Sequence, residues 1–154
     1  MTGEELFLRY AFPCAEGRVI RGKLDEAHFE ILKKLVLGGD EPRQELLKYR
    51  RPHVFRHLLR YCFPHAFRRL REFAESSDRE RWALGTVAEF WRSHHEHRGE
   101  CRVRRGVIVA ASDQFPRVLL GEEAVRTINL YGLPLRNGEE VCVHLSVVVE
   151  QTEI

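Results

Sequence analysis

Apolar residues in the first two-thirds of the chain recur every three or four positions, which is the period of an amphipathic helix. Thr2 followed by Glu5 predicts a capping box at the start of a first helix, which lasts until Pro13. Asp25 predicts the N-cap of a second helix, whose apolar stripe ends at Gly38. Both helices are expected to begin where a side chain accepts hydrogen bonds from backbone N–H groups that lack a partner within the helix.

Prolines and a second Ser/Glu pair predict the starts of the later helices. Pro52 and Pro64 each occupy a first-turn position, where the missing N–H group has no partner to lose. Ser77 and Glu80 form a second predicted capping box, which opens the longest predicted helix. The helices predicted in this part of the chain run over about 40–49, 53–62, 65–75 and 78–97.

One octapeptide occurs twice in similar form. Residues 8–15 read LRYAFPCA and residues 59–66 read LRYCFPHA, so six of eight positions match. Two copies are fewer than a solenoid requires, and two helix ends can resemble each other by chance. The pair is therefore compatible with two related helical units and equally with coincidence.

The hydrophobic period shortens to two residues after Gly99, which predicts strands. Residues 101–110 and 141–150 alternate along their whole length, and shorter strands are predicted over 117–120 and 125–130. Glycine-containing turns separate them. We therefore expect an α+β protein in which residues 1–98 form a helical bundle of five to six helices. Residues 99–154 are expected to form a small antiparallel β-barrel or curled sheet.

Composition restricts the class of protein. The chain has 154 residues, of which 44% are hydrophobic and 31% are charged, so it has enough apolar material to fold. No run approaches the roughly 20 apolar residues of a membrane span, and the acidic start differs from a secretory signal. The four cysteines show no disulfide spacing. We therefore expect a cytoplasmic protein with free thiols and no membrane association.

Positive charge is concentrated between Arg43 and Arg71. This segment holds nine Lys and Arg residues and a single acid, although the net charge of the whole chain is only +2. Aromatic rings are interleaved with the arginines, as on surfaces that bind nucleic acids. The helical spacing of the rings instead predicts that they face the core behind a solvated arginine face. The candidate contacts to an acidic protein partner or to nucleic-acid phosphates are Arg50, Arg51, Arg68 and Arg69.

The order of sequence blocks in the β half resembles the small hydrogenase-maturation chaperones of the HypC/HupF type. In that family four residues separate a cysteine from a glycine that precedes an apolar strand. A glycine turn follows, then an arginine with alternating apolar residues before Leu-Pro, and finally a valine-rich strand that contains a histidine. The matching blocks are Cys101-x4-Gly106, 107–109, 118–121, 126–134 and 138–144. The resemblance covers residues 101–149, about a third of the chain.

This resemblance implies a non-catalytic accessory protein that binds a partner protein and holds an iron fragment. The family's opening cysteine and strand histidine are implicated in holding the iron-cyanide-carbonyl unit, and they correspond to Cys101 and His144. A thiolate is a soft donor for low-valent iron, and an imidazole can bind the metal or donate a hydrogen bond to cyanide. Both residues also have ordinary explanations, Cys101 as a small buried residue and His144 as part of a solvated sheet face.

A second arrangement with metal-binding chemistry combines Cys62, His65, His94 and His97, to which Cys101 could contribute. A Cys-x-x-His pair and a group of histidines at a helix end provide donors that zinc accepts. The helix dipole alone also favours histidines at a helix C-terminus. Iron is therefore the cofactor that the resemblance implies, and zinc is the alternative.

The sequence contains no motif of an independent enzyme, whether a phosphate-binding loop, a nucleophile elbow, a zinc-protease helix or a dinucleotide fingerprint. We therefore expect an accessory protein rather than an enzyme. Two alternatives stay open. One is a nucleic-acid-binding module that uses residues 43–71, and the other is a structural protein that forms homo-oligomers through an open sheet edge.

Overall fold

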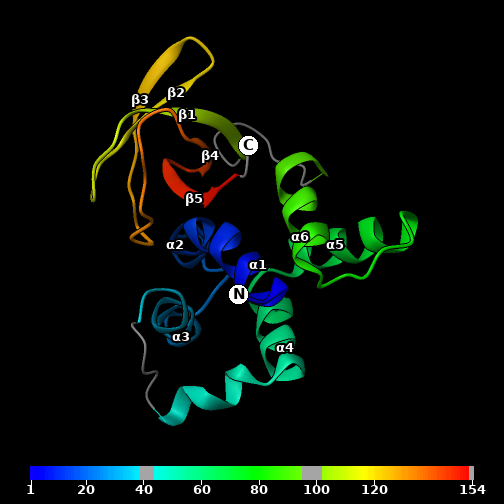
Figure 1. Cartoon of the computed structure of the whole chain (residues 1–154). Coiled ribbons are helices and arrows are strands. Elements are labelled where there is room, and N and C mark those ends of the chain that lie inside the picture. The colour runs from blue at the N-terminus through cyan, green and yellow to red at the C-terminus, as the bar shows by residue number, and fades with distance from the viewer. Residues whose placement is uncertain (39–43, 95–101, 153–154) are drawn as a thin grey trace. The chain divides into compact units, whose positions relative to one another are not determined.

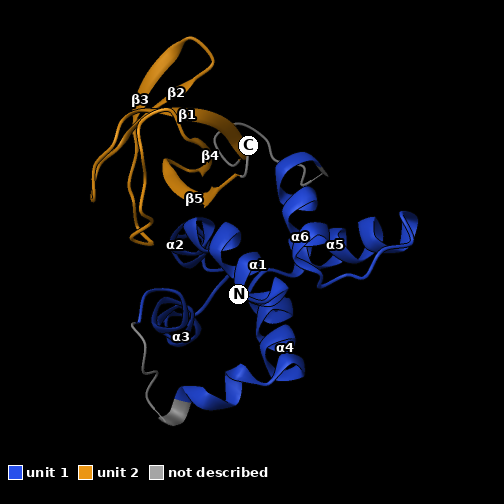
Figure 2. Cartoon of the chain, in the orientation of Figure 1, with its two compact units in different colours: residues 1–95 blue, residues 96–154 orange. Residues whose placement is uncertain are grey.

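The computed structural model describes residues 1–38, 44–94 and 102–152. The chain divides into two compact units, residues 1–95 and 96–154 (Figure 2). Helices make up the first unit, and a five-stranded antiparallel sheet makes up the second. The predicted α+β class is therefore confirmed. Among the described residues, no helix combines the length and the apolar character needed to cross a bilayer.

The helical unit contains, among its described residues, six α-helices and three short 3-10 or π segments (Figure 1). In chain order these are α1 (Gly3–Ala11), η1 (Phe12–Cys14), α2 (Ala15–Ile20), α3 (Glu26–Leu37), η2 (Gln44–Arg50), α4 (Pro52–Cys62), α5 (Pro64–Ser76), α6 (Leu84–Glu89) and η3 (Phe90–His94).

Local signals in the sequence determine where four of these helices begin. The Thr2 hydroxyl accepts a hydrogen bond from the N–H of Glu5 at 3.1 Å, and the Glu5 carboxylate accepts one from the N–H of Thr2 at 3.4 Å. The Asp25 carboxylate accepts a bond from the first turn of α3 at 3.0 Å. Pro52 and Pro64 are the first residues of α4 and α5. All four starts are as predicted, because each depends on residues within one turn of the helix end.

The long helix predicted over 78–97 is wrong. Ser77 ends α5 instead of opening a new helix, and Asp78 adopts a left-handed backbone with φ 52°. The N–H of Asp78 donates to the carbonyl of Glu75 at 3.3 Å, and the N–H of Arg79 donates to the carbonyl of Ala74 at 2.9 Å. This is a Schellman closure, so the residues that resemble a capping box terminate the preceding helix. Only α6 and η3 are helical in the described part of the range.

The core of the helical unit is built around α1. Its apolar side chains are buried on all sides, as Leu6, Phe7, Leu8, Tyr10 and Ala11 are each at most 2% exposed. The ring of Phe7 meets three other rings edge-on, with centroid distances of 5.3 to 6.4 Å to Trp91, Trp82 and Phe63. Gly3 allows this approach, since a Cβ atom there would lie 1.8 Å from the carbonyl oxygen of Trp82.

The repeated octapeptide forms a helix-to-helix junction in both places. In the first copy α1 ends at Ala11, and in the second α4 ends at Cys62. Phe12 and Phe63 are the C-cap residues, and the N–H of each donates to the carbonyl of the leucine four residues earlier. The backbones then differ, because Phe12 stays helical at φ −55° whereas Phe63 is at φ −132°. Both copies of the octapeptide therefore end a helix in the same way, but the backbone that follows differs between them.

The sheet unit has strand order β3-β2-β1-β4-β5, with every neighbouring pair antiparallel. The strand predicted over 141–150 is interrupted, because Leu145 and Ser146 form a tight turn with φ values of 49° and 63°. Neither residue is the Asn or Gly that two successive positive φ values favour, so the sequence pattern gives no signal for this turn. The strands are β1 (Arg104–Ala110), β2 (Arg117–Leu120), β3 (Glu123–Arg126), β4 (Glu140–His144) and β5 (Val147–Gln151).

The sheet curls around its own core without closing into a barrel. An isolated parallel bridge joins Ile128, which follows the edge strand β3, to Val147 at the start of the opposite edge strand β5. The curled sheet encloses one apolar cluster, whose members are Ile108, Val118, Leu120, Val141, Val143 and Val148. Of the two predicted forms, a barrel or a curled sheet, the structure has the curled sheet.

Gly106 allows a close contact between β1 and β2. A Cβ atom at this position would lie 2.6 Å from the carbonyl oxygen of Leu119 and 2.6 Å from a methyl group of Val118. Real Cβ contacts are almost never this short, so only glycine fits here. The glycine that contributes to the family resemblance therefore has a packing explanation within this chain.

Candidate functional site

The predicted pair Cys101 and His144 is only partly described. His144 is the last residue of β4 and is fully buried. Cys101 lies outside the described residues. The register of β1 against β4 pairs Arg104 with Val143, so β1 starts beside the end of β4 that carries His144. A joint iron site at this pair stays a prediction.

The predicted zinc ligands Cys62 and His65 differ in environment. Cys62 lies at the end of α4 and is completely buried, and this burial, with nearby Asp25, raises the pKa of its thiol to about 12. His65 is exposed on the first turn of α5, where its Nδ1 lies 3.3 Å from the guanidinium of Arg68. His97 and the side chain of His94 lie outside the described residues. Within residues 1–38, 44–94 and 102–152, no three His, Cys, Asp or Glu side chains are grouped to hold a metal.

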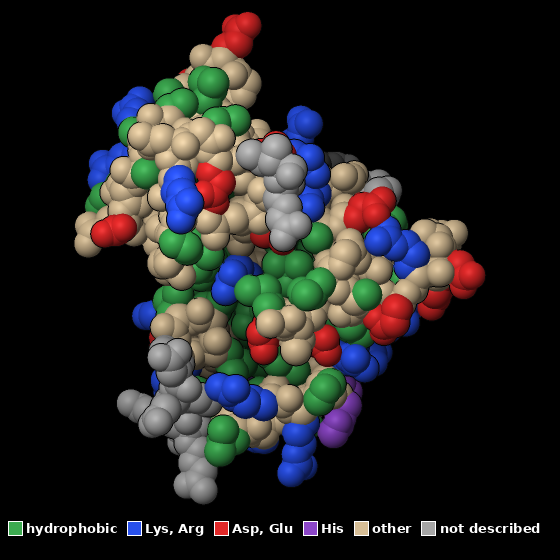
Figure 3. All heavy atoms as spheres, viewed as in Figure 1, with side chains coloured by type: hydrophobic (Ala, Val, Ile, Leu, Met, Phe, Trp, Pro, Cys, Tyr) green, Lys and Arg blue, Asp and Glu red, His purple; other side chains and the backbone are tan. Residues whose placement is uncertain are grey.

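The arginine-rich helix α4 has one apolar face and one basic face. Its buried residues, Phe55, Leu58, Leu59 and Cys62, follow helical spacing and face the core. The opposite side of α4 and the adjoining η2 form what we call the basic face. Figure 3 shows separate blue side chains among green and tan ones in the lower part of the view. The basic face consists of exposed side chains, which are Lys48, Arg50, Arg51, His53, His57 and Arg60. The sequence has no acidic residue from Leu46 to Arg71, so the helix itself does not neutralise this charge.

The four candidate arginines fall into two pairs with different electrostatics. Arg68 and Arg69 on α5 both lie close to Glu72, at 3.8 and 3.3 Å. Arg50 and Arg51 are exposed and form no ion pair with any described residue. The charge that is available to a partner is therefore greater at Arg50 and Arg51.

The aromatic rings of this region do not form a surface on which bases could stack. Phe55 and Phe63 are buried, at 9% and 5% exposure. Phe67 packs against Trp82 with a centroid distance of 5.6 Å. Tyr61 is exposed, but its ring lies against the imidazole of His28 at 4.4 Å. The prediction that the rings face the core is confirmed for Phe55 and Phe63 and is wrong for Tyr61.

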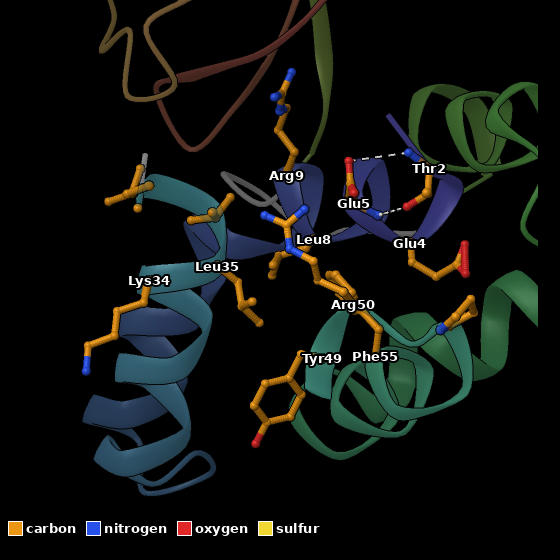
Figure 4. A pocket seen from close by; sticks show the side chains of 14 residues that line it. Thr2, Glu4, Glu5, Leu8, Arg9, Lys34, Leu35, Tyr49, Arg50 and Phe55 are labelled. Carbon is orange, nitrogen blue, oxygen red and sulfur yellow. Dashed lines mark hydrogen bonds between the residues drawn. The ribbon is translucent and has the colours of Figure 1, made fainter. Parts of the chain in front are cut away.

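A cavity of about 660 Å³ opens beside the basic face (Figure 4). It lies entirely within the helical unit and is lined by α1, the C-terminal end of α3, η2 and the first turn of α4. Leu8, Leu35 and Phe55 give it apolar walls, and Arg50 extends into it from η2. Of the residues predicted to bind a partner, Arg50 alone lines this cavity.

Sequence reasoning missed a polar cluster around Asp25. The imidazole Nδ1 of His28 donates to the Asp25 carboxylate at 2.7 Å, and the Tyr61 hydroxyl donates to the same carboxylate at 3.3 Å. The bond from the His28 side chain, followed by the one from the His28 backbone N–H, lowers the pKa of Asp25 to about 2. The three-residue spacing of Asp25 and His28 was a usable signal, whereas the contribution of Tyr61 depends on tertiary packing.

No known protein family, no curated protein and no solved structure matches this chain. The resemblance of residues 101–149 to the maturation chaperones therefore remains untested by any relative. What the chain can do has to be inferred from its own residues.

Proposed function

We propose that this protein is a non-catalytic accessory protein that binds an acidic partner protein through the basic face of η2 and α4. The observation that carries the proposal is the pairing pattern of the arginines. Arg51 and Arg60 are exposed and have no acidic partner among the described residues, whereas Arg68 and Arg69 share Glu72. Unpaired surface charge steers association with a surface of opposite sign and disfavours partners of the same sign.

A protein is favoured over a nucleic acid as this partner because most rings near the basic face are buried or already packed against another side chain, as Tyr61 is against His28. Single-stranded nucleic acids are bound by combining a cationic groove with aromatic side chains on which bases stack. Phe55 and Phe63, which interleave with the arginines in the sequence, are buried. A carboxylate-rich polypeptide needs only the cations, and arginine pairs with carboxylates through two parallel hydrogen bonds.

The test compares the binding of a short labelled polyglutamate peptide with that of single-stranded and double-stranded DNA, using the full chain at low salt. The double variant Arg51→Ala and Arg60→Ala is expected to weaken peptide binding about fivefold or more, since each exposed ion pair is worth up to about 1 kcal/mol. The matched control, Arg68→Ala with Arg69→Ala, removes the same charge from α5 and is expected to change the affinity less. Equal losses in both variants, or tighter binding of DNA than of the peptide, would overturn the proposal.

A second proposal extends the first to the sheet unit, where Cys101 and His144 would hold an iron fragment for the partner. Its support is the register of β1 and β4, which brings the start of β1, three residues after Cys101, to the end of β4 that carries His144. The test is to incubate the reduced chain with ferrous iron and to measure the iron that is retained. Cys101→Ala and His144→Gln are both expected to lose iron, and Cys14→Ala is expected to keep it. Equal retention in the three variants would remove this site.

A further inference from the structure

The cavity in the helical unit has the size of a small-molecule site. Its volume of about 660 Å³ lies within the range of roughly 300 to 1,000 Å³ that is typical of ligand pockets. Four elements that are separate in the sequence contribute to it, so its walls are held by the packing of α1, α3, η2 and α4.

Apolar side chains form one part of the cavity wall, and charged and polar side chains form the rest. Leu8 and Phe55 are held in the core, at 2% and 9% exposure, and present their remaining surface to the cavity. Leu35 on α3 is half-buried and lies opposite Phe55 across the cavity (Figure 4). Tyr49 from η2 adds a half-buried ring beside them. Such walls favour an apolar body, because each apolar group transferred from water contributes to binding.

One cation dominates the interior of this cavity. Figure 4 shows the guanidinium of Arg50 in the middle of the cavity, whereas Arg9 and Lys34 point outward from its rim. The two acidic residues of the lining are already engaged. The Glu4 carboxylate is 3.2 Å from Arg56, and the Glu5 carboxylate belongs to the capping box of α1. No described acidic side chain forms an ion pair with Arg50.

A helix start adds to the positive potential at the same place. The first turn of α4 borders the cavity through Pro52 and Phe55. The N-cap residue, Arg51, makes no side-chain hydrogen bond to this turn, so no side-chain acceptor offsets the partial positive charge of the helix start. An anion placed beside Arg50 would therefore be attracted by a side-chain charge and by the helix dipole together.

We propose that this cavity binds an amphipathic anion, which has a carboxylate or phosphate head beside Arg50 and an apolar body against Leu8, Leu35 and Phe55. The planar guanidinium can donate two parallel hydrogen bonds to either head group. This activity goes beyond the proposed partner docking. Arg50 is the one residue that the basic face and the cavity share, whereas Arg51 and Arg60, which test the docking, do not line the cavity.

The experiment measures the affinity of the full chain for three probes with the same alkyl body, which are octanoate, octyl phosphate and uncharged octanamide. Both anions are expected to bind more tightly than octanamide, and the tighter of the two identifies the preferred head group. Arg50→Gln is expected to weaken anion binding about tenfold or more while leaving octanamide unchanged, because a charge-assisted bond is lost. Arg50→Lys is expected to retain part of the preference for anions.

Two further variants separate this site from general surface charge. Arg71→Gln removes an exposed charge of α5 that does not line the cavity and is expected to leave octanoate affinity within about twofold, as befits a screened surface charge. Leu35→Trp narrows the cavity at a half-buried position and is expected to weaken all three probes. The proposal is overturned if Arg50→Gln and Arg71→Gln behave alike, if octanamide binds as tightly as octanoate, or if no probe binds saturably.

Discussion

The carboxylate of Asp25 caps α3 and, at the same time, holds the imidazole of His28, whose Nδ1 lies 2.7 Å away. The same carboxylate accepts a bond from the backbone N–H of His28 at 3.0 Å. Tyr61, at the far end of α4, donates to it as well. One surface carboxylate therefore ties the start of α3 to the end of α4.

This arrangement predicts an acid-dependent loss of stability. The pKa of Asp25 is lowered from 3.8 to about 2, first of all by the hydrogen bond from the His28 side chain. A carboxyl whose pKa is lower in the folded state stabilises the fold above the unfolded pKa, and this stabilisation disappears as the pH falls through the folded pKa. Asp25→Ala is expected to lower the thermal midpoint at neutral pH. The gap to the parent protein should narrow between pH 3.8 and about 2.

Thermal unfolding followed by circular dichroism at a series of pH values measures the difference in thermal midpoint between the Asp25 variant and the parent protein. Glu26→Ala is the matched control, because Glu26 is an exposed carboxylate in the first turn of the same helix. The Glu26 variant should keep the acid dependence of the parent protein. If the Asp25 variant also kept the acid dependence of the parent protein, the Asp25 cap would not be the source of that dependence.

The buried thiol of Cys62 is expected to be chemically inert in the folded protein. Its pKa of about 12 leaves on the order of one thiolate in ten thousand at pH 8, and the thiolate is the reactive form. Alkylation by iodoacetamide, followed by mass spectrometry, should therefore modify the partly exposed Cys14 well before Cys62. Rapid labelling of Cys62 without unfolding would contradict the buried environment.

The same raised pKa has a consequence in alkali. A thiol whose pKa is higher in the folded state contributes stability that is complete below the unfolded pKa, here 9.0, and is lost as the pH rises toward 12. Cys62→Ala removes this titration and leaves a small cavity, so it is expected to cost roughly 1 kcal/mol at neutral pH. Its unfolding midpoint should fall less steeply than that of the parent protein above pH 9.

Two glycine-to-alanine substitutions are predicted to have opposite signs. Gly106→Ala places a methyl group 2.6 Å from a backbone oxygen of β2, so the sheet unit should lose about 2 kcal/mol. Gly85→Ala in α6 meets only the flexible end of Arg79 at 3.7 Å and should stabilise the helical unit by up to about 1 kcal/mol. Urea titrations measure both changes, and a neutral Gly106→Ala would refute the tight contact between β1 and β2.

We predict that substitutions in the turn between β4 and β5 can stabilise the sheet unit. Leu145 and Ser146 both have positive φ, which suits Asn-Gly far better than Leu-Ser. Replacing them by Leu145→Asn and Ser146→Gly should stabilise the sheet by about 1 kcal/mol, because the left-handed backbone then costs less. The control is Gly138→Ala at another positive-φ position of the sheet unit, which should destabilise the same unit. An unchanged midpoint for the Asn-Gly variant would contradict this turn geometry.

The features that could be predicted from the sequence are those that depend on one helical turn or one strand. Thr2 and Asp25 cap helices as expected, because the donor and the acceptor lie within three residues of each other. The capping box predicted at Ser77 is wrong, because the same residue types also suit a helix C-terminus. The left-handed backbone of Asp78 decides between a helix start and a helix end. The sequence pattern predicts one continuous strand over 141–150, because no glycine or asparagine marks the turn within it.

The functional features depend on contacts between distant segments and were correspondingly harder to predict. Arg50 was recognised as a candidate from its charge, but its place in a cavity depends on where α1 and α3 pack. The spacing of Arg68, Arg69 and Glu72 along one helix could have indicated that those charges are paired. Periodicity cannot predict whether Cys101 and His144 meet. It predicts which residues form strands, but not the register with which one strand pairs with another.

The aromatic core around Phe7 makes this protein convenient to study by spectroscopy. Both tryptophans, Trp82 and Trp91, contact Phe7 within residues 1–95, and the sheet has none. Tryptophan fluorescence therefore reports the unfolding of the helical unit, and the sheet unit contributes no tryptophan signal. Comparing emission with a backbone signal would show whether the two units unfold in a single transition or in sequence.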